Sequence, residues 1–81
     1  MFFTYCKETG CVLVKSEEHP SIVFNLANNF DEHFSIIERD VDRNEMYGKL
    51  LKVQNDQIVV VGPFNEETMS QMCGDCPSPI Q

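Results

Sequence analysis

The chain has 81 residues, of which 42% are hydrophobic, and its 13 carboxylates against 6 lysines and arginines give a net charge of −7. This length suits one domain, which we place at residues 1–81, and the hydrophobic content is too high for a disordered chain. The negative charge disfavours direct binding to nucleic acid, and no apolar run approaches the roughly 20 residues of a membrane span.

The N-terminal segment predicts a β-hairpin. Aromatic and β-branched residues from Phe2 to Val14 flank Lys7-Glu8-Thr9-Gly10, where Gly10 can adopt the positive φ angle of a tight turn. The chain does not open with a basic region and an apolar stretch of signal-peptide length. We therefore expect a cytoplasmic protein, located in the host cytoplasm or the virion if it is viral.

The segment from Ser21 to Val41 has the spacing of an amphipathic helix. Its apolar residues recur at intervals of three and four positions, and they are Val23, Ala27, Phe30, Phe34, Ile37 and Val41. Asparagine is a poor residue for a helix interior, so a break at Asn28-Asn29 stays open. The residues from Phe34 to Arg39 also fit a strand.

Two further elements complete the chain. The residues from Tyr47 to Val61 predict a second hairpin, whose continuous apolar run from Ile58 suggests a strand covered on both faces or by a partner. A short helix is expected to begin at Asn65 and to end near Gly74. Residues 74–81 then form an extended tail.

The predicted order ββαββα belongs to the α+β class. We expect one antiparallel sheet of four strands with the long helix packed on one face, because all strand pairs can then be local in sequence. A mainly β meander with short helices is the alternative.

The cysteines form two close pairs near opposite ends of the chain, Cys6 with Cys11 and Cys73 with Cys76. Thiolates in this C-x4-C and C-x2-C arrangement can hold a structural zinc ion, which is the one cofactor that the sequence suggests. A disulfide between Cys6 and Cys11 across the first hairpin is an alternative, although a reducing cytoplasm disfavours it. A third alternative leaves all the thiols free.

No catalytic signature is found in the sequence. A nucleophile elbow, a glycine-rich phosphate loop and an H-E-x-x-H motif are all missing. Paired acids such as Glu66-Glu67 are adjacent in sequence, and adjacent residues do not face one another on a helix or strand. His19 and His33 have no spacing that requires them as ligands. We expect no enzyme activity, no catalytic residue and no small-molecule substrate.

Protein binding is the function that remains. We expect a small acidic structural or accessory protein, of the style that phages encode, which joins a larger assembly or itself without contacting nucleic acid or membrane. A strand edge is a ready template for such contacts. The apolar residues expected at this surface are Phe2, Phe3, Val59 and Val61.

A second hypothesis uses the negative charge. An acidic chain can inhibit a basic, nucleic-acid-binding partner by imitating its ligand, and such binding weakens steeply with salt. The carboxylates of this display would be Glu17, Glu18, Asp31, Glu32, Glu38, Asp40 and Asp42. A zinc-stabilised adaptor is compatible with either hypothesis, because structural zinc fixes the shape of a domain without choosing its partner.

Overall fold

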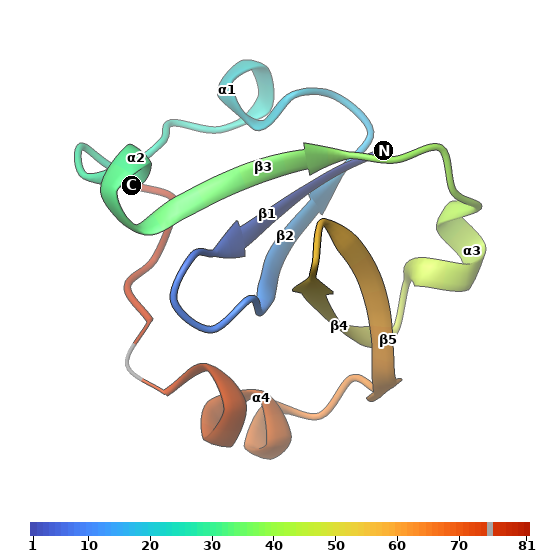
Figure 1. Ribbon diagram of the computed structural model, residues 1–81. Coiled ribbons are helices and arrows are strands. Elements are labelled where there is room, and N and C mark those ends of the chain that lie inside the picture. Colours follow the sequence, from blue (N-terminus) through green and yellow to red (C-terminus); the bar gives the residue numbers. More distant parts are fainter. Residues whose placement is uncertain (75) are drawn as a thin grey trace.

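A computed structural model describes residues 1–74 and 76–81 and combines short helices with antiparallel sheets, so the fold belongs to the mixed α+β class. The elements in chain order are β1 (Phe2–Cys6), β2 (Val12–Ser16), α1 (Pro20–Val23), α2 (Phe30–His33), β3 (Phe34–Glu38), α3 (Arg43–Met46), β4 (Lys49–Gln54), β5 (Gln57–Pro63) and α4 (Glu66–Cys73). Figure 1 shows the β4–β5 pair beside the sheet that contains β1 and β2.

β1 is the central strand of a three-stranded sheet with the order β2-β1-β3, and both neighbours run antiparallel to it. Phe3 on β1 pairs with Lys15 on one side and with Ile37 on the other, and it is fully buried. The predicted first hairpin is therefore present. Its third strand comes from the middle of the chain, where the sequence favoured a helix.

β4 and β5 form the predicted second hairpin, with a turn in which Asn55 and Asp56 have φ angles of 53° and 61°. Positive φ at both central residues is typical of the type I′ turn, whose twist matches that of the two strands. The register shifts between Leu50 and Leu51, and both leucines are buried. The extra residue of this bulge is Val61 on β5, and Leu51 belongs to the main core.

The two sheets meet where the β1–β2 turn contacts β4. Cys11 forms an isolated bridge with Lys52, and the Val53 N–H donates to the Gly10 carbonyl at 2.7 Å. Gly10 has a φ of 80°, and a Cβ at this position would lie 2.6 Å from the Val53 carbonyl oxygen, so this approach requires glycine. The main core is formed by buried residues of both sheets: Phe3, Val12, Ile37 and Leu51.

The segment predicted as one long helix forms two short helices and a strand instead. α1 and α2 have four residues each, and β3 follows α2 directly. Phe24 and Phe34, at the C-terminal caps of these helices, both have extended backbone, so neither helix continues. The asparagine-rich loop at residues 25–29 separates the helices, as the low helix propensity of asparagine favours. Two small sheets therefore replace the single sheet under a long helix.

α4 is the helix predicted after the second hairpin. The Asn65 side chain accepts hydrogen bonds from the backbone N–H groups of Glu67 and Thr68, at 2.9 and 3.2 Å. Gly74 ends the helix with a φ of 56°, which glycine adopts without strain. Cys73 is the only residue of α4 that is buried, so this position connects the helix to the rest of the fold.

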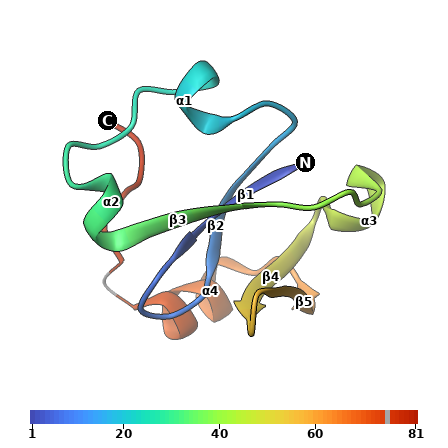
Figure 2. The same cartoon turned by 45° about the horizontal axis from the view of Figure 1, so that its top comes forward.

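The C-terminal tail packs against the loop between α1 and α2. The Ala27 N–H donates to the Pro79 carbonyl at 3.0 Å, and the Gln81 N–H donates to the Asn25 carbonyl at 2.9 Å. Figures 1 and 2 show the C-terminus beside this loop, on the opposite side from the N-terminus. Asp75, which belongs to the predicted tail, lies outside the described residues. No helix in the described part of the chain is long and apolar enough to cross a membrane.

Candidate functional site

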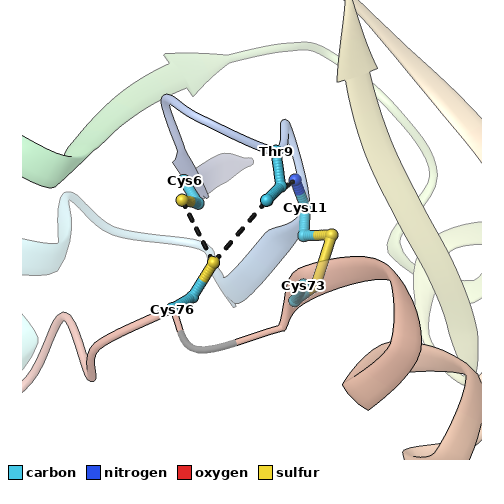
Figure 3. Close-up of a disulfide and its surroundings, with 5 residues drawn as sticks. All are labelled: Cys6, Thr9, Cys11, Cys73 and Cys76. Atoms are coloured by element: carbon cyan, nitrogen blue, oxygen red, sulfur yellow. Dashed lines mark hydrogen bonds between the residues drawn. A yellow bond between two sulfur atoms is a disulfide. The ribbon is translucent and has the colours of Figure 1, made fainter.

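The two predicted cysteine pairs come together between the β1–β2 turn and the C-terminal end of α4 (Figure 3). Cys11 and Cys73 form a disulfide, with their Cα atoms 5.9 Å apart. Cys6 and Cys76 are free thiols, and the Cys76 thiol donates a hydrogen bond to the Cys6 sulfur at 3.2 Å. Each contact therefore joins one N-terminal cysteine to one C-terminal cysteine. We call these four residues the cysteine cluster.

The first turn holds Cys6 and Cys11 close together through backbone hydrogen bonds. The Cys6 N–H donates to the Cys11 carbonyl at 3.0 Å, and the Gly10 N–H donates to the Cys6 carbonyl at 2.7 Å. The alternative disulfide between Cys6 and Cys11 is not formed, because Cys11 bonds to Cys73 instead.

The end of α4 supplies the other two sulfurs. The Gly74 N–H donates to the Ser70 carbonyl at 2.9 Å, and the Cys76 N–H donates to the Cys73 carbonyl at 3.2 Å. Cys73 is 5% exposed, so its side chain points from the helix into the fold. The backbone bonds keep Cys76 near Cys73 and thereby near the first turn.

Thr9 is a member of the site that sequence reasoning missed. Its hydroxyl oxygen accepts a hydrogen bond from the Cys11 N–H at 3.2 Å and lies 3.7 Å from the Cys76 sulfur (Figure 3). Thr9 thus contacts one cysteine of each bonded pair. Its place in a tight turn between Cys6 and Cys11 is the signal that could have pointed to it.

The two free thiols differ in acidity. Burial raises the pKa of the Cys6 thiol, but hydrogen bonds from Cys76, Thr9 and Glu8 outweigh burial and bring this pKa below its ordinary value. Burial and the hydrogen bond to Cys6 raise the pKa of the Cys76 thiol. Cys6 is therefore the thiol that ionises first, and Cys76 donates to it.

Surface hollows give solvent access to the cysteine cluster. One hollow of about 300 Å³ has Glu8 on its wall, and another of about 310 Å³ has Leu13 and Phe64. Cys73 and Cys76 line both hollows. A small ion or a small thiol can therefore reach this end of the site.

The oxidised cluster is not a metal site as it stands. Within residues 1–74 and 76–81, no three histidine, cysteine, aspartate or glutamate side chains are arranged to hold a metal ion. In this state the disulfide also removes the sulfurs of Cys11 and Cys73 as thiolate ligands. The two histidines have other neighbours: His19 Nδ1 lies 2.8 Å from the Ser21 hydroxyl, and the His33 ring packs edge-on against a phenylalanine.

The predicted partner-binding apolar residues divide between surface and core. Val59 and Val61 on β5 are 39% and 45% exposed, and the intervening Val60, which sequence reasoning missed, is 48% exposed. Phe2 is half-buried and Phe3 is fully buried. Phe3 is thus a core residue, contrary to expectation, because β1 became the central strand of its sheet.

The predicted acidic residues are all exposed, and they are Glu17, Glu18, Asp31, Glu32, Glu38, Asp40 and Asp42. They are spread over several segments: Asp31 and Glu32 are on α2, and β3 separates them from Asp40 by about 16 Å of strand. Arg43 forms an ion pair with Glu17 and so places a cation among the acids. The acidic display stays a prediction.

No family model matches the chain, and no curated protein or solved structure is significantly similar to it. Function is therefore inferred from the two features described above, the exposed strand β5 and the cysteine cluster.

Proposed function

We propose that this protein is a small, non-catalytic structural protein that assembles with a second copy of itself through the free edge of β5. The exposure of three consecutive valines carries the proposal, since Val59, Val60 and Val61 are 39%, 48% and 45% exposed. Among the described strands β5 pairs with β4 alone, so its other edge offers backbone N–H and C=O groups to a further strand.

β5 has few of the devices that usually protect an edge strand. Natural edges carry charged side chains, prolines or bulges that discourage pairing with another chain. The residues from Gln57 to Gly62 carry no charge, and Pro63 lies at one end of the strand. The bulge opposite Leu50 and Leu51 is the other such device. A mostly apolar edge of seven residues is suited to strand addition.

A second copy fits this edge for two reasons. An antiparallel pair centred on Val60 brings Val59 opposite Val61 of the other copy, and cross-strand pairs of β-branched residues stabilise sheets. In this pairing no charged side chains face each other across the two β5 strands, although each chain carries a net charge of −7. It has the two-fold symmetry that most homodimers have.

Two exposed aromatic residues extend the surface beyond β5. Tyr47 and Phe64 are 48% and 49% exposed and lie at the open end of the hairpin, where the Phe64 N–H donates to the Gly48 carbonyl at 2.9 Å. Tyrosine and phenylalanine are enriched in protein interfaces. We expect both rings to become less exposed in the dimer.

Sedimentation equilibrium across a range of protein concentrations tests the proposal. We expect a concentration-dependent dimer in buffer without reductant, where the Cys11–Cys73 disulfide stays formed, and mass spectrometry verifies that the free thiols of Cys6 and Cys76 have not linked two chains. A chain that stays monomeric into the millimolar range would overturn the proposal. Binding only to a basic partner, with a steep loss on adding salt, would favour the acidic display instead.

Substitutions on β5 test which surface is used. Val59→Asp and Val61→Asp should each weaken self-association by roughly tenfold or more, because a carboxylate would have to leave water. Val59 pairs with Lys52 on β4, so the fold can accept an aspartate there. Ile22→Asp is the matched control, since Ile22 is 73% exposed and lies on α1. Equal weakening by the control would show that β5 is the wrong surface.

A further inference from the structure

The cysteine cluster brings four sulfurs from the two ends of the chain into one small site. The Cys11–Cys73 disulfide joins residues 62 positions apart, and the thiol contact between Cys6 and Cys76 joins residues 70 positions apart. Thr9 contacts both pairs through its hydroxyl, at 3.2 Å from the Cys11 nitrogen and 3.7 Å from the Cys76 sulfur. Figure 3 shows the Cys6 and Cys76 sulfurs facing each other, with the Cys11–Cys73 disulfide beside them and Thr9 between the two pairs.

We propose that, after reduction of the Cys11–Cys73 disulfide, the four cysteines bind one zinc ion as a tetrahedral structural site. A small-molecule thiol is the reductant: two of its molecules join in a disulfide, and their two electrons and two protons convert Cys11 and Cys73 into thiols. Each of the four cysteines then loses its thiol proton to solvent as its sulfur binds the metal.

The distances within each pair are compatible with such a site if the side chains rotate. Zinc–sulfur bonds of about 2.3 Å place neighbouring sulfurs about 3.8 Å apart in a tetrahedron. The sulfurs of Cys6 and Cys76 are 3.2 Å apart and therefore have to separate only slightly. The Cα atoms of Cys11 and Cys73 lie 5.9 Å apart, so rotation about their Cα–Cβ bonds can separate the freed sulfurs.

The ligand chemistry favours zinc over other ions. Four thiolates without an oxygen or nitrogen ligand select a soft ion with tetrahedral geometry, whereas calcium and magnesium require oxygen ligands. Zinc also needs no redox partner. The hollows against Cys73 and Cys76 provide the path by which the ion enters.

Zinc and the disulfide exclude one another, because the disulfide removes Cys11 and Cys73 from the ligand set. Both the disulfide-bonded and the zinc-bound state connect the β1–β2 turn to α4, whose only buried residue is Cys73. Phe64 of the proposed dimer surface also lines one of the hollows against Cys73 and Cys76. Zinc content is nevertheless measured separately from self-association, so each proposal can fail without the other.

Native mass spectrometry measures the metal content directly, on protein reduced with a phosphine, supplied with zinc and freed of excess metal. We expect one zinc ion for each reduced chain and none for an oxidised chain. Cobalt(II) in place of zinc should give the intense visible absorption of a tetrahedral thiolate site. A reduced chain that stays free of metal, or a weak octahedral cobalt spectrum, would overturn the proposal.

A double variant separates ligand loss from loss of folding. Cys6→Ser combined with Cys76→Ser keeps the Cys11–Cys73 disulfide, so its fold can be verified in the oxidised state before reduction. We expect its reduced form to bind zinc at least about 100-fold more weakly than the reduced wild type, since losing even an outer-shell partner of a metal costs 10–100-fold. His33→Gln is the control and should bind zinc normally. Undiminished binding by the double variant, or a large loss in His33→Gln, would refute the four-cysteine ligand set.

Discussion

Gly10 links the first turn to the second sheet at a point where no side chain fits. Its N–H donates to the Cys6 carbonyl and its carbonyl accepts from Val53, both at 2.7 Å. Gly10→Ala should lower the free energy of unfolding by about 2 kcal/mol or more, because alanine is strained at positive φ and its Cβ would force the backbone at Val53 to move. Urea denaturation measures this loss.

Gly48→Ala is the matched control for that substitution. Gly48 also has a positive φ, of 74°, but a Cβ there would meet nothing within 4 Å. Gly48→Ala should therefore lower the free energy of unfolding only by the backbone strain, about 1 kcal/mol. Equal losses at Gly10 and Gly48 would show that the contact with Val53 adds nothing.

Thr4 is a core residue whose polar atom has no partner. It is 1% exposed, and its hydroxyl oxygen makes no hydrogen bond to the described residues. Thr4→Val keeps the shape of the side chain and removes the unsatisfied group, so we expect a gain of about 1 kcal/mol in the free energy of unfolding. Thermal denaturation compares the two proteins. A loss of stability would reveal a bound water or another partner at this hydroxyl.

At the residue scale, the sequence predicted which cysteines form the site but not which cysteine contacts which. The spacing of Cys6, Cys11, Cys73 and Cys76 indicated two pairs that could share one site, and the structure brings all four together. The choice of partner follows from how α4 lies against the β1–β2 turn, which no local pattern encodes. Thr9 was missed for the same reason, since its role depends on that long-range contact.

At the scale of elements, the hairpins were predictable and the middle of the chain was not. The strands of each hairpin pair locally, and turn residues such as Gly10 and Asn55 mark their ends. The helical stripe was misleading: its members Phe34 and Ile37 are buried as expected, but on a strand. Pairing of that strand with β1, across 28 to 36 positions of sequence, outweighed the local periodicity.

α4 has a sequence signal that the structure bears out, and its cap can be tested. Asn65→Ala removes the acceptor for the N–H groups of Glu67 and Thr68 and should cost about 1 kcal/mol. We expect faster amide hydrogen exchange within α4, and a larger effect in reduced, metal-free protein, where Cys73 no longer ties the helix to the turn. Unchanged exchange in both states would mean that the cap does not limit the stability of the helix.

For the molecule as a whole, the cross-link compensates for a small core. A domain of this length buries a limited share of its surface, so its stability is expected to be marginal. The disulfide closes a loop of 62 positions, for which the chain-entropy model gives a stabilisation of about 4 kcal/mol. Reduction in the presence of a chelator should therefore lower the free energy of unfolding by roughly 2–4 kcal/mol.

Urea denaturation of oxidised, reduced and reduced zinc-loaded protein compares these states. Zinc should restore much of the loss, because a metal that binds the folded chain alone stabilises it by mass action. Reduced protein as stable as oxidised protein, with chelator present, would contradict the stabilising role of the disulfide.

The link between Cys11 and Cys73 also decides how the chain responds to force. Tension applied to the two termini passes through the disulfide and bypasses the loop of 62 positions between them. At about 3.5 Å per extended residue, this loop holds roughly 220 Å of hidden length. When the chain is stretched from its ends, the oxidised molecule reaches a much shorter end-to-end length than the reduced molecule. The redox state of the protein therefore sets its maximum length under load.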